Sequence, residues 1–439
     1  MRRLHRPRGG LWSHGDFLKL WTGQSISELG SQVSQLAIPW VALVTLKSSA
    51  FEIATLGTVQ FLPFVLFTLP AGVWVDWIPR RLVLIVGDFG RALLLATIPL
   101  AYALGALTLW QLYAVGFLVG IHTVFFDVAY QSYLPSLIDR DALVDGNSKL
   151  QVTASGALVV GPGLSGTLIR LATAPYAILV DAVSFVVSGG FTIAIRKREE
   201  RQREHQQRRL LPELWEGLRY VLRNRYLLPQ AISTGSSNFF SNVGFAILLV
   251  YAHRRLGLSA SLIGIAFSLG GLGWMIGASQ AARLRRLFGV GGATTIGVAV
   301  GGPAALLVPF APKGNAAVAF LVAFGIIEGF GAVVYNIQQV SLRQAITPAR
   351  IQGRMNATMR FLVWGTIPLG SLTGGALAAT VGLRTTLFVG AIGQFVALLP
   401  IVLSPIRGLR DFPEPEEDES LLHEGGTMGP AAATVEADA

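Results

Sequence analysis

The stretch Gly72-Val-Trp-Val-Asp76-Trp-Ile-Pro-Arg80-Arg81 lies between two long apolar segments of the chain. Its glycine has no side chain, so two helices can approach closely there, and its proline stiffens a tight turn. Its two arginines favour the side of a membrane on which positive charge is retained. The stretch therefore predicts a charged turn between two helices that cross a membrane.

Apolar composition extends far beyond the segments beside this turn. Of the 439 residues, 52% are hydrophobic and 14% are charged, and the mean hydropathy is +0.55. Soluble domains carry about 25% charged residues, so the chain has too few charges to cover a soluble protein of its length. Cysteine is absent, which excludes disulfides and thiolate metal sites. The composition predicts an all-α polytopic membrane protein.

Twelve apolar blocks are long enough to cross about 30 Å of hydrocarbon as helices. They are residues 17–45, 51–75, 82–104, 109–133, 150–171, 176–195, 228–251, 260–282, 290–311, 316–341, 357–380 and 385–405. An even number of crossings places both termini on one side of the membrane. No cleavage signal follows the basic N-terminus, so we expect the first helix to be its own insertion signal.

Lysine and arginine predict which side that is. Six of the 35 basic residues fall at the outer ends of the spans, namely Lys47, Arg170, Arg254, Arg255, Lys313 and Arg384. Because positively charged loops stay in the cytoplasm, we expect both termini to be cytoplasmic. The net charge of +10 then marks loops that face an anionic leaflet, and it gives no reason to expect nucleic-acid binding.

A polar stretch separates the sixth span from the seventh. Residues 196–209 hold seven basic and three acidic residues, and apolar residues then recur at helical spacing from Leu211 to Leu222. This predicts a basic linker with an amphipathic helix on the inner leaflet; a regulatory or partner-binding loop is the alternative. The tail from Asp411 onward has nine acids and no lysine or arginine, so we expect it to be disordered and cytoplasmic.

The two halves repeat each other weakly. A shift of 205 residues maps Gly72, Arg80 and Arg81 onto Gly277, Arg285 and Arg286, and a shift of 206 maps Pro162 onto Pro368. Such matches at nearly constant offset support a 6+6 duplication. The predicted domains are an N-terminal six-helix bundle, the linker, a C-terminal six-helix bundle and the acidic tail, at residues 1–195, 196–227, 228–406 and 407–439.

The spacing of Gly72, Asp76, Arg80 and Arg81, in a short cytoplasmic turn, resembles the signature loop of the major facilitator superfamily. The resemblance covers residues 15–406 and implies that family's fold, with twelve helices in two pseudo-symmetric six-helix bundles. It also implies that Asp76 contacts the second half when the cavity faces outward, through Arg354, Arg360 or the start of the eleventh span. A loop that only fixes topology is the alternative. Ala281 replaces the acid in the second copy.

The fifth span carries Gly161, Pro162 and Gly166, which are similar to the antiporter motif of drug and proton exchangers in that superfamily. Small residues let helices pack closely, and a proline inside a helix bends it. The motif favours export. Ordinary helix packing in a chain with 50 glycines is the alternative.

Ionisable side chains inside the spans are candidates for function, because each costs about 2.5–3.5 kcal/mol to insert. Glu28 in the first span shares one helix face with three polar residues, Gln24, Ser31 and Gln35. Glu328 in the tenth span shares a face with Tyr335 and Gln339. We expect these faces, together with Asn238 of the seventh span, to line a wet cavity. Glu28 and Glu328 are the proton-site candidates, and hydrogen-bonded packing acids are the alternative.

Three more ionisable residues lie in the third and fourth spans. We expect Arg91 and Asp127 to form a structural ion pair, and a role in proton or substrate binding is the alternative for both. His122 titrates in the useful range, although a lone histidine at such a position is more often packed or hydrogen-bonded.

The sequence lacks the motifs of several functional classes. The sequence has no phosphate-binding Gly-x4-Gly-Lys-[Ser/Thr], so ATP is not the expected energy source. It has no His-Glu-x2-His or clustered-carboxylate motif, so we expect neither an enzyme nor a bound metal or cofactor.

The phrase Leu20-Trp21-x-Gly23-Gln24-Ser-Ile-Ser27 looks like the bacterial branch that holds macrolide, multidrug and enterobactin exporters. The resemblance implies export of amphipathic small molecules by proton antiport with alternating access. An exporter of siderophores or self-made metabolites is one alternative, and a membrane regulatory protein without transport is another. We expect a monomer in the bacterial cytoplasmic membrane, with protons, lipid and a small-molecule substrate as its partners.

Overall fold

The computed structural model describes residues 10–197, 210–348 and 351–413, and these residues form helices with no strand among them. The first half holds six long helices: α1 (Gly15–Trp40), α2 (Ala50–Trp77), α3 (Arg80–Ala103), α4 (Leu109–Leu137), α5 (Leu143–Ala172) and α6 (Ala174–Ala194). The acidic tail beyond residue 413 and linker residues 198–209 lie outside the described residues.

The second half begins after a short linker helix, α7 (Leu210–Arg223). Its helices are α8 (Leu227–Arg254), α9 (Ala260–Gly270), α10 (Leu272–Gly301), α11 (Leu307–Phe310), α12 (Ala317–Ile346), α13 (Gln352–Trp364), α14 (Thr366–Thr380) and α15 (Leu383–Leu403). Helix α7 follows residues 198–209 of the linker and ends four residues before α8 begins. It packs closely against α13: a Cβ added to Gly217 of α7 would lie 2.4 Å from the hydroxyl of Thr358 of α13.

Twelve crossing segments are present in the described residues, as the apolar blocks predict. Nine segments are long and apolar enough to span a membrane, and one of them, Ala260–Phe310, holds two crossings. The chain reverses inside it at Gly289, whose φ of 73° and ψ of 178° lie outside the helical region and favour glycine. Helices α1 and α8 complete the set; both are long, at 26 and 28 residues, but more polar.

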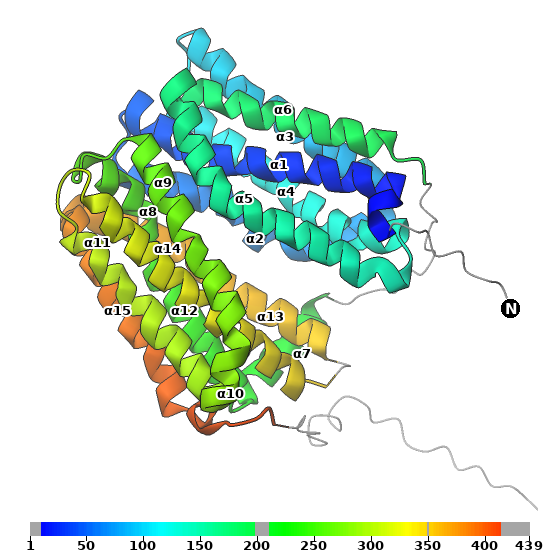
Figure 1. Ribbon diagram of the computed structural model, residues 1–439, viewed down its shortest axis with the longest axis vertical. Helices are drawn as coiled ribbons and strands as arrows, with labels where there is room; N and C mark the ends of the chain where they lie inside the picture. Colours follow the sequence, from blue (N-terminus) through cyan, green and yellow to red (C-terminus); the bar gives the residue numbers. More distant parts are fainter. Residues whose placement is uncertain (1–9, 198–209, 349–350, 414–439) are drawn as a thin grey trace, which may run out of the picture.

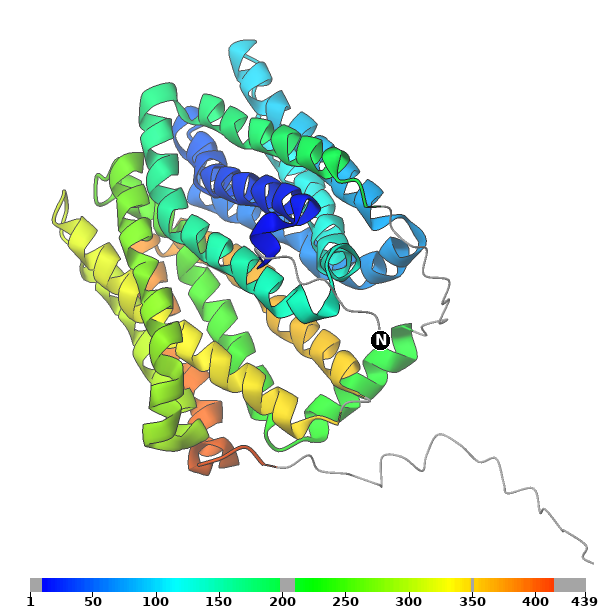
Figure 2. The ribbon, with the colours of Figure 1, turned by 45° about the vertical axis from the view of Figure 1, so that its right-hand side comes forward.

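The helices form two bundles (Figure 1). In the first bundle α6 packs against α1 and α3, and α2 packs against α4. In the second bundle α10 packs against α12, and α8 packs against α14 and α15. Figures 1 and 2 show the bundles meeting at one end and spreading apart toward the end at which α1 begins. We call these the junction end and the open end.

Two helix pairs join the bundles at the junction end, α5 with α9 and α2 with α14. In the first pair the Ser261 hydroxyl donates to the Gly166 carbonyl at 3.0 Å, and the Gly163 N–H donates to the Ser268 hydroxyl at 2.8 Å. Arg254 adds a bond between the halves by donating to the Ser48 carbonyl at 2.6 Å. These bonds hold the halves together at one end only.

Glycines set how closely α5 and α9 approach. A Cβ on Gly264 would lie 2.2 Å from the Pro162 carbonyl oxygen, and a Cβ on Gly166 would lie 2.5 Å from the Ala260 carbonyl oxygen. Backbone atoms cannot move aside as a flexible side chain can. The Gly161, Pro162 and Gly166 segment is therefore part of the contact between the halves, which agrees with the predicted close packing.

The first testable consequence concerns this contact. Gly264→Val should lower the midpoint of thermal unfolding in detergent, because overpacking costs about 1–3 kcal/mol. Gly190→Val is the matched control, since a Cβ at Gly190 meets nothing within 4 Å. Equal midpoints for the two variants would contradict the close approach of α5 and α9.

Candidate transport site

Two neighbouring cavities occupy the space between and within the bundles. The smaller one measures about 540 Å³ and is lined by α1, α4 and α5. The larger one measures about 1300 Å³ and is lined by α5 and Gln32 of α1 in the first half and by helices of the second half, chiefly α8, α10, α12 and α15. Ser148 and Gln151 of α5 line both cavities, so the two adjoin each other.

The smaller cavity brings two carboxyl groups together, and we call it the acidic cavity. Glu28 of α1 and Asp127 of α4 both line it, beside Gln24 and Tyr130. Glu28 is half-buried and Asp127 is exposed. The predicted polar face of α1 therefore lines a cavity through Gln24 and Glu28. Ser31 and Gln35 fall outside the lining of both cavities, and Gln32 of the same helix lines the larger one.

The larger cavity, the central cavity, holds Glu328 in mainly apolar surroundings. Besides Tyr335, its lining includes five aromatic side chains, all from helices of the second half: Phe240, Phe245, Phe267, Trp274 and Phe324. Tyr335 also lines it, and its hydroxyl lies 2.6 Å from that of Thr234. Among the described residues, Glu328 has neither an ion pair nor a hydrogen bond through its carboxylate. It is the one charged residue in the described lining.

Two residues expected in the cavity are used elsewhere. Asn238 donates to the Val363 carbonyl at 3.0 Å, and Gln339 donates to Asn336 at 3.0 Å. Neither lines the central cavity, whereas their neighbours Ser237 and Asn336 do. Helical spacing identified the helices that line the cavity, but the lining residue is one position away on α8 and about one helix turn away on α12.

The prediction of an ion pair between Arg91 and Asp127 is wrong. Arg91 bonds Asp88, one turn earlier on α3, at 2.6 Å, and both side chains are buried. The guanidinium also lies 4.2 Å from the ring centre of Phe126 and 4.0 Å from that of Phe185. Asp88 and Arg91 are three residues apart on α3, so they meet on one helix face whatever the orientation of α4. The two aromatic rings further stabilise the buried guanidinium. Asp127 therefore lines the acidic cavity without an ion pair to Arg91.

His122 packs against a helix backbone. A Cβ on Gly90 of α3 would come within 2.6 Å of its imidazole ring, so the ring fills the space above that glycine. The two cavity linings do not include it. Its position fits the packed alternative.

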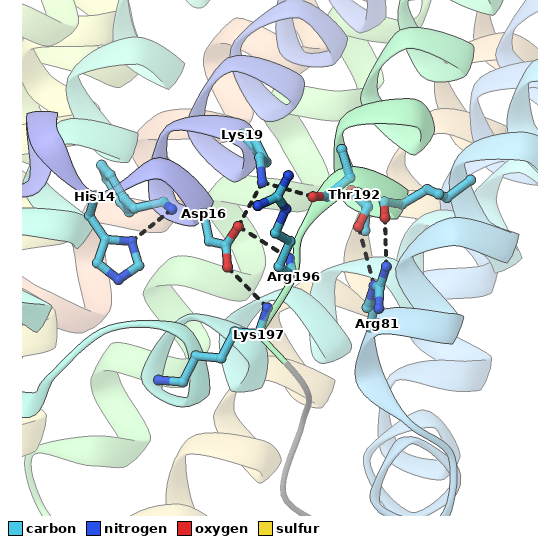
Figure 3. A network of polar contacts seen from close by, with 10 residues as sticks. His14, Asp16, Lys19, Arg81, Thr192, Arg196 and Lys197 are labelled. Carbon is cyan, nitrogen blue, oxygen red and sulfur yellow. Dashed lines mark hydrogen bonds and ion pairs between the residues drawn. The ribbon is translucent and has the colours of Figure 1, made fainter.

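The arginines of the signature turn are bound to their own half, and Figure 3 shows the contacts of Arg81. Arg81 donates to the carbonyls of Thr192 and Ile193 at the end of α6, at 3.3 and 2.6 Å. Arg80 donates to the Ser132 carbonyl at 3.2 Å. Cations stabilise the negative ends of helices in this way. Gly72 lies in α2 beside open space, and the Asp76 side chain lies outside the described part of the chain.

Asp16 ties the start of α1 to the end of α6 at the same end of the bundle. Its carboxylate accepts from Lys19 at 2.8 Å and from the backbone N–H groups of Arg196 and Lys197 at 3.2 and 3.0 Å (Figure 3). Across the opening, Arg354 of α13 bonds Glu216 of α7. Arg354, one of the second-half residues that Asp76 is expected to contact, is thus paired with the linker helix in this conformation.

Sequence reasoning missed Asp181 of α6. Its side chain is 2% exposed, and the Ser184 hydroxyl lies 3.2 Å from its carboxylate. A Cβ on Gly30 of α1 would lie 2.8 Å from the same carboxylate. The signal was present, because Asp181 is a charge within a predicted span. The lining of the two cavities does not include it.

Comparison with known proteins settles the family. The family of transmembrane secretion effectors of the major facilitator superfamily matches this chain over residues 11–427. The chain belongs to this family. The all-α fold of two helix bundles agrees with this family.

Curated proteins that are similar to this chain include efflux proteins. It is 26% identical over 390 residues to the multidrug efflux pump Tap of Mycolicibacterium fortuitum, covering 85% of this chain and 90% of that one. It is 26% identical over 179 residues to macrolide efflux protein A of Streptococcus pyogenes, covering 41% of this chain and 44% of that one.

Solved structures share the fold. A bacterial homologue of the iron transporter ferroportin in its inward-facing state superposes with a TM-score of 0.72 at 18% identity, over 88% of this chain and 98% of that one. The same homologue in its outward-facing state gives 0.56 at 19% identity, with the same coverage. The nucleoside transporter NupG gives 0.69 at 13% identity, over 88% and 98% of the two chains.

The second testable consequence separates a structural acid from a cavity acid. Asp88→Asn should reduce the free energy of unfolding by about 3–5 kcal/mol, because it leaves the buried Arg91 cation without its partner. Asp127→Asn, in the open acidic cavity, should change it little. Denaturation of the purified protein in mixed micelles measures both. A larger loss for Asp127→Asn than for Asp88→Asn would show that Arg91 depends on Asp127 after all.

Proposed function

We propose that the protein exports amphipathic small molecules from the cytoplasm in exchange for protons. The observation that carries the proposal is the pair of adjoining cavities. A large, mainly apolar cavity that could hold a drug-sized molecule adjoins a small cavity with two carboxyl groups. Binding of substrate and binding of protons would then influence each other through shared residues of α5 and through charge.

The open end faces the cytoplasm in this proposal. It carries the arginines of both signature turns, Arg80, Arg81, Arg285 and Arg286, together with Arg196 and Lys197. Positive charge on cytoplasmic loops favours that orientation. The greater likeness to an inward-facing than to an outward-facing transporter structure supports an inward-facing state. The closed junction end would then separate the cavities from the outside.

Export would proceed by alternating access. In the inward-facing state the ionised carboxylates favour binding of substrate. After the bundles rock about the junction, the cavities face outward and protons from outside neutralise Glu28, Asp127 or Glu328. Loss of that negative charge weakens the hold on a cation and favours its release. The return to the inward-facing state then carries protons to the cytoplasm.

The signature turn would act on the rocking step. In the outward-facing state the open end closes, and Asp76 would meet α13 of the second half. Arg354 would exchange Glu216 for Asp76 during that closure. Helix α7 would thereby stabilise the inward-facing state, and the acid of the turn would stabilise the outward-facing state.

The third testable consequence is loss of coupling at the acidic cavity. Glu28→Gln should reduce pH-driven uptake of a fluorescent lipophilic cation by on the order of 5–150-fold, the usual size of coupling between two sites. The assay uses inside-out vesicles with an acidic interior and the membrane potential held at zero. Asp141→Asn, at an exposed position in a short 3₁₀ turn, is the control and should leave uptake unchanged.

The fourth consequence concerns gating. Asp76→Asn should slow turnover while the ratio of protons to substrate stays the same, because this acid would stabilise one state and carry no proton. Stopped-flow uptake together with a pH-sensitive dye measures both quantities. If neither Asp76→Asn nor Glu28→Gln alters pH-driven flux, the coupling mechanism is wrong. A protein without transport would show no substrate-dependent flux in any variant.

A further inference from the structure

We propose that Asp181 of α6 binds a proton between α1 and α6, apart from both cavities, and that this proton keeps the first bundle packed. The lining of the two cavities does not include Asp181. The site is therefore independent of the proposed export, which uses the acids that line the cavities.

Helices α1 and α6 meet along buried stripes of small and polar residues. On α6, Asp181, Ser184 and Ser188 are 2%, 5% and 2% exposed. On α1, a Cβ on Gly30 would lie 2.1 Å from the Ser184 hydroxyl, and a Cβ on Gly23 would lie 3.3 Å from the Ser188 backbone. Asp181 therefore lies inside a close contact between two helices, with the α1 backbone on one side.

The hydroxyl of Ser184 indicates the protonation state of Asp181. It lies 2.7 Å from the backbone carbonyl oxygen of Asp181 and 3.2 Å from its carboxyl oxygen Oδ1. A hydroxyl has one hydrogen to donate, and only the shorter distance is in the usual range of an O–H···O bond. The hydrogen therefore goes to the carbonyl, and the hydroxyl oxygen is left to accept from Oδ1. Only a protonated carboxyl group has a hydrogen to donate there.

The neighbouring charges on α1 and α3 also favour the neutral acid. Arg91 and Glu28 are the charged side chains that act on Asp181 electrostatically. The guanidinium of Arg91 already pairs with Asp88 at 2.6 Å. Glu28, when ionised, would repel a second negative charge.

Helix α5, the third helix that packs against α6, adds no counter-charge among its described residues. Asp145 and Lys149 pair with each other, and Arg170 is exposed. An ionised Asp181 would thus be buried without a cation of its own. Burying an unpaired charge costs so much that the group takes up a proton instead.

The bound proton makes the packing of the first bundle depend on pH. Aspartate in an unfolded chain is ionised above about pH 5, so the folded protein holds one proton more than the unfolded chain. The free energy of unfolding must then fall as the pH rises. Loss of the proton would place a charge between α1 and α6 and loosen the helix that carries Glu28.

Denaturation in mixed micelles between about pH 5 and 8 tests the bound proton. Asp181→Asn replaces a neutral acid by a neutral amide of the same shape. Its folding equilibrium constant should gain on that of the wild-type protein by up to about tenfold per pH unit as the pH rises. Asp141→Asn, at an exposed position, is the matched control and should differ from wild type by a constant amount. A constant difference for Asp181→Asn as well would show that Asp181 is ionised, which would overturn the proposal.

Infrared spectroscopy tests the same site without requiring Asp181→Asn to fold alone. The combination of Glu28→Gln, Asp127→Asn and Glu328→Gln removes the acids of both cavities. At about pH 8, where exposed carboxyl groups are ionised, this protein should still show the carbonyl band of a protonated carboxyl group. The band should persist when a lipophilic cation is added, because the site lies outside the cavities. Absence of the band, or its loss on addition of the cation, would contradict a separate proton site.

Discussion

The close backbone contact between α5 and α9 fastens the two halves of the protein at one end. Gly264 and Pro162 approach so closely that no side chain fits between them, and Gly166 repeats the contact one turn further along. Because the halves are fastened at this end, the opposite ends of the helices must spread. That spreading creates both cavities and their openings. A looser contact would remove the geometric reason for an opening at only one end.

The ionisable residues inside the membrane include two groups, a buried ion pair within one bundle and three acids that line the cavities. The buried Asp88–Arg91 pair lies on α3, and its guanidinium packs against Phe126 of α4 and Phe185 of α6 within one bundle. Glu28, Asp127 and Glu328 instead lie where the bundles spread, in space that can be hydrated or filled by substrate. A rigid bundle with its charges paired can rock as a unit. In the proposed cycle, these three acids would be the groups whose charge changes.

Most of the fold could be predicted from the sequence, because spans are long apolar runs and the repeat fixes their grouping. Even the reversal at Gly289 separates two predicted spans. The site was predicted less well. Helical spacing identified α1 and α12 as cavity helices but selected Ser31 and Gln339 where Gln32 and Asn336 line the cavity. Rotation of a helix about its axis and the choice of Asp88 over Asp127 by Arg91 depend on packing between helices, which spacing along one chain does not specify.

If the proposed exchange occurs, substrate and protons compete for the same carboxyl groups. The most direct test is proton release when tetraphenylphosphonium is added to the purified protein in weakly buffered detergent solution. The account predicts that the wild-type protein releases protons into the medium, and that the combination of Glu28→Gln, Asp127→Asn and Glu328→Gln removes the release while the protein stays folded. Binding of the cation with no proton release from the wild-type protein at any pH between 5 and 9, about the range in which perturbed carboxyl groups titrate, would contradict it.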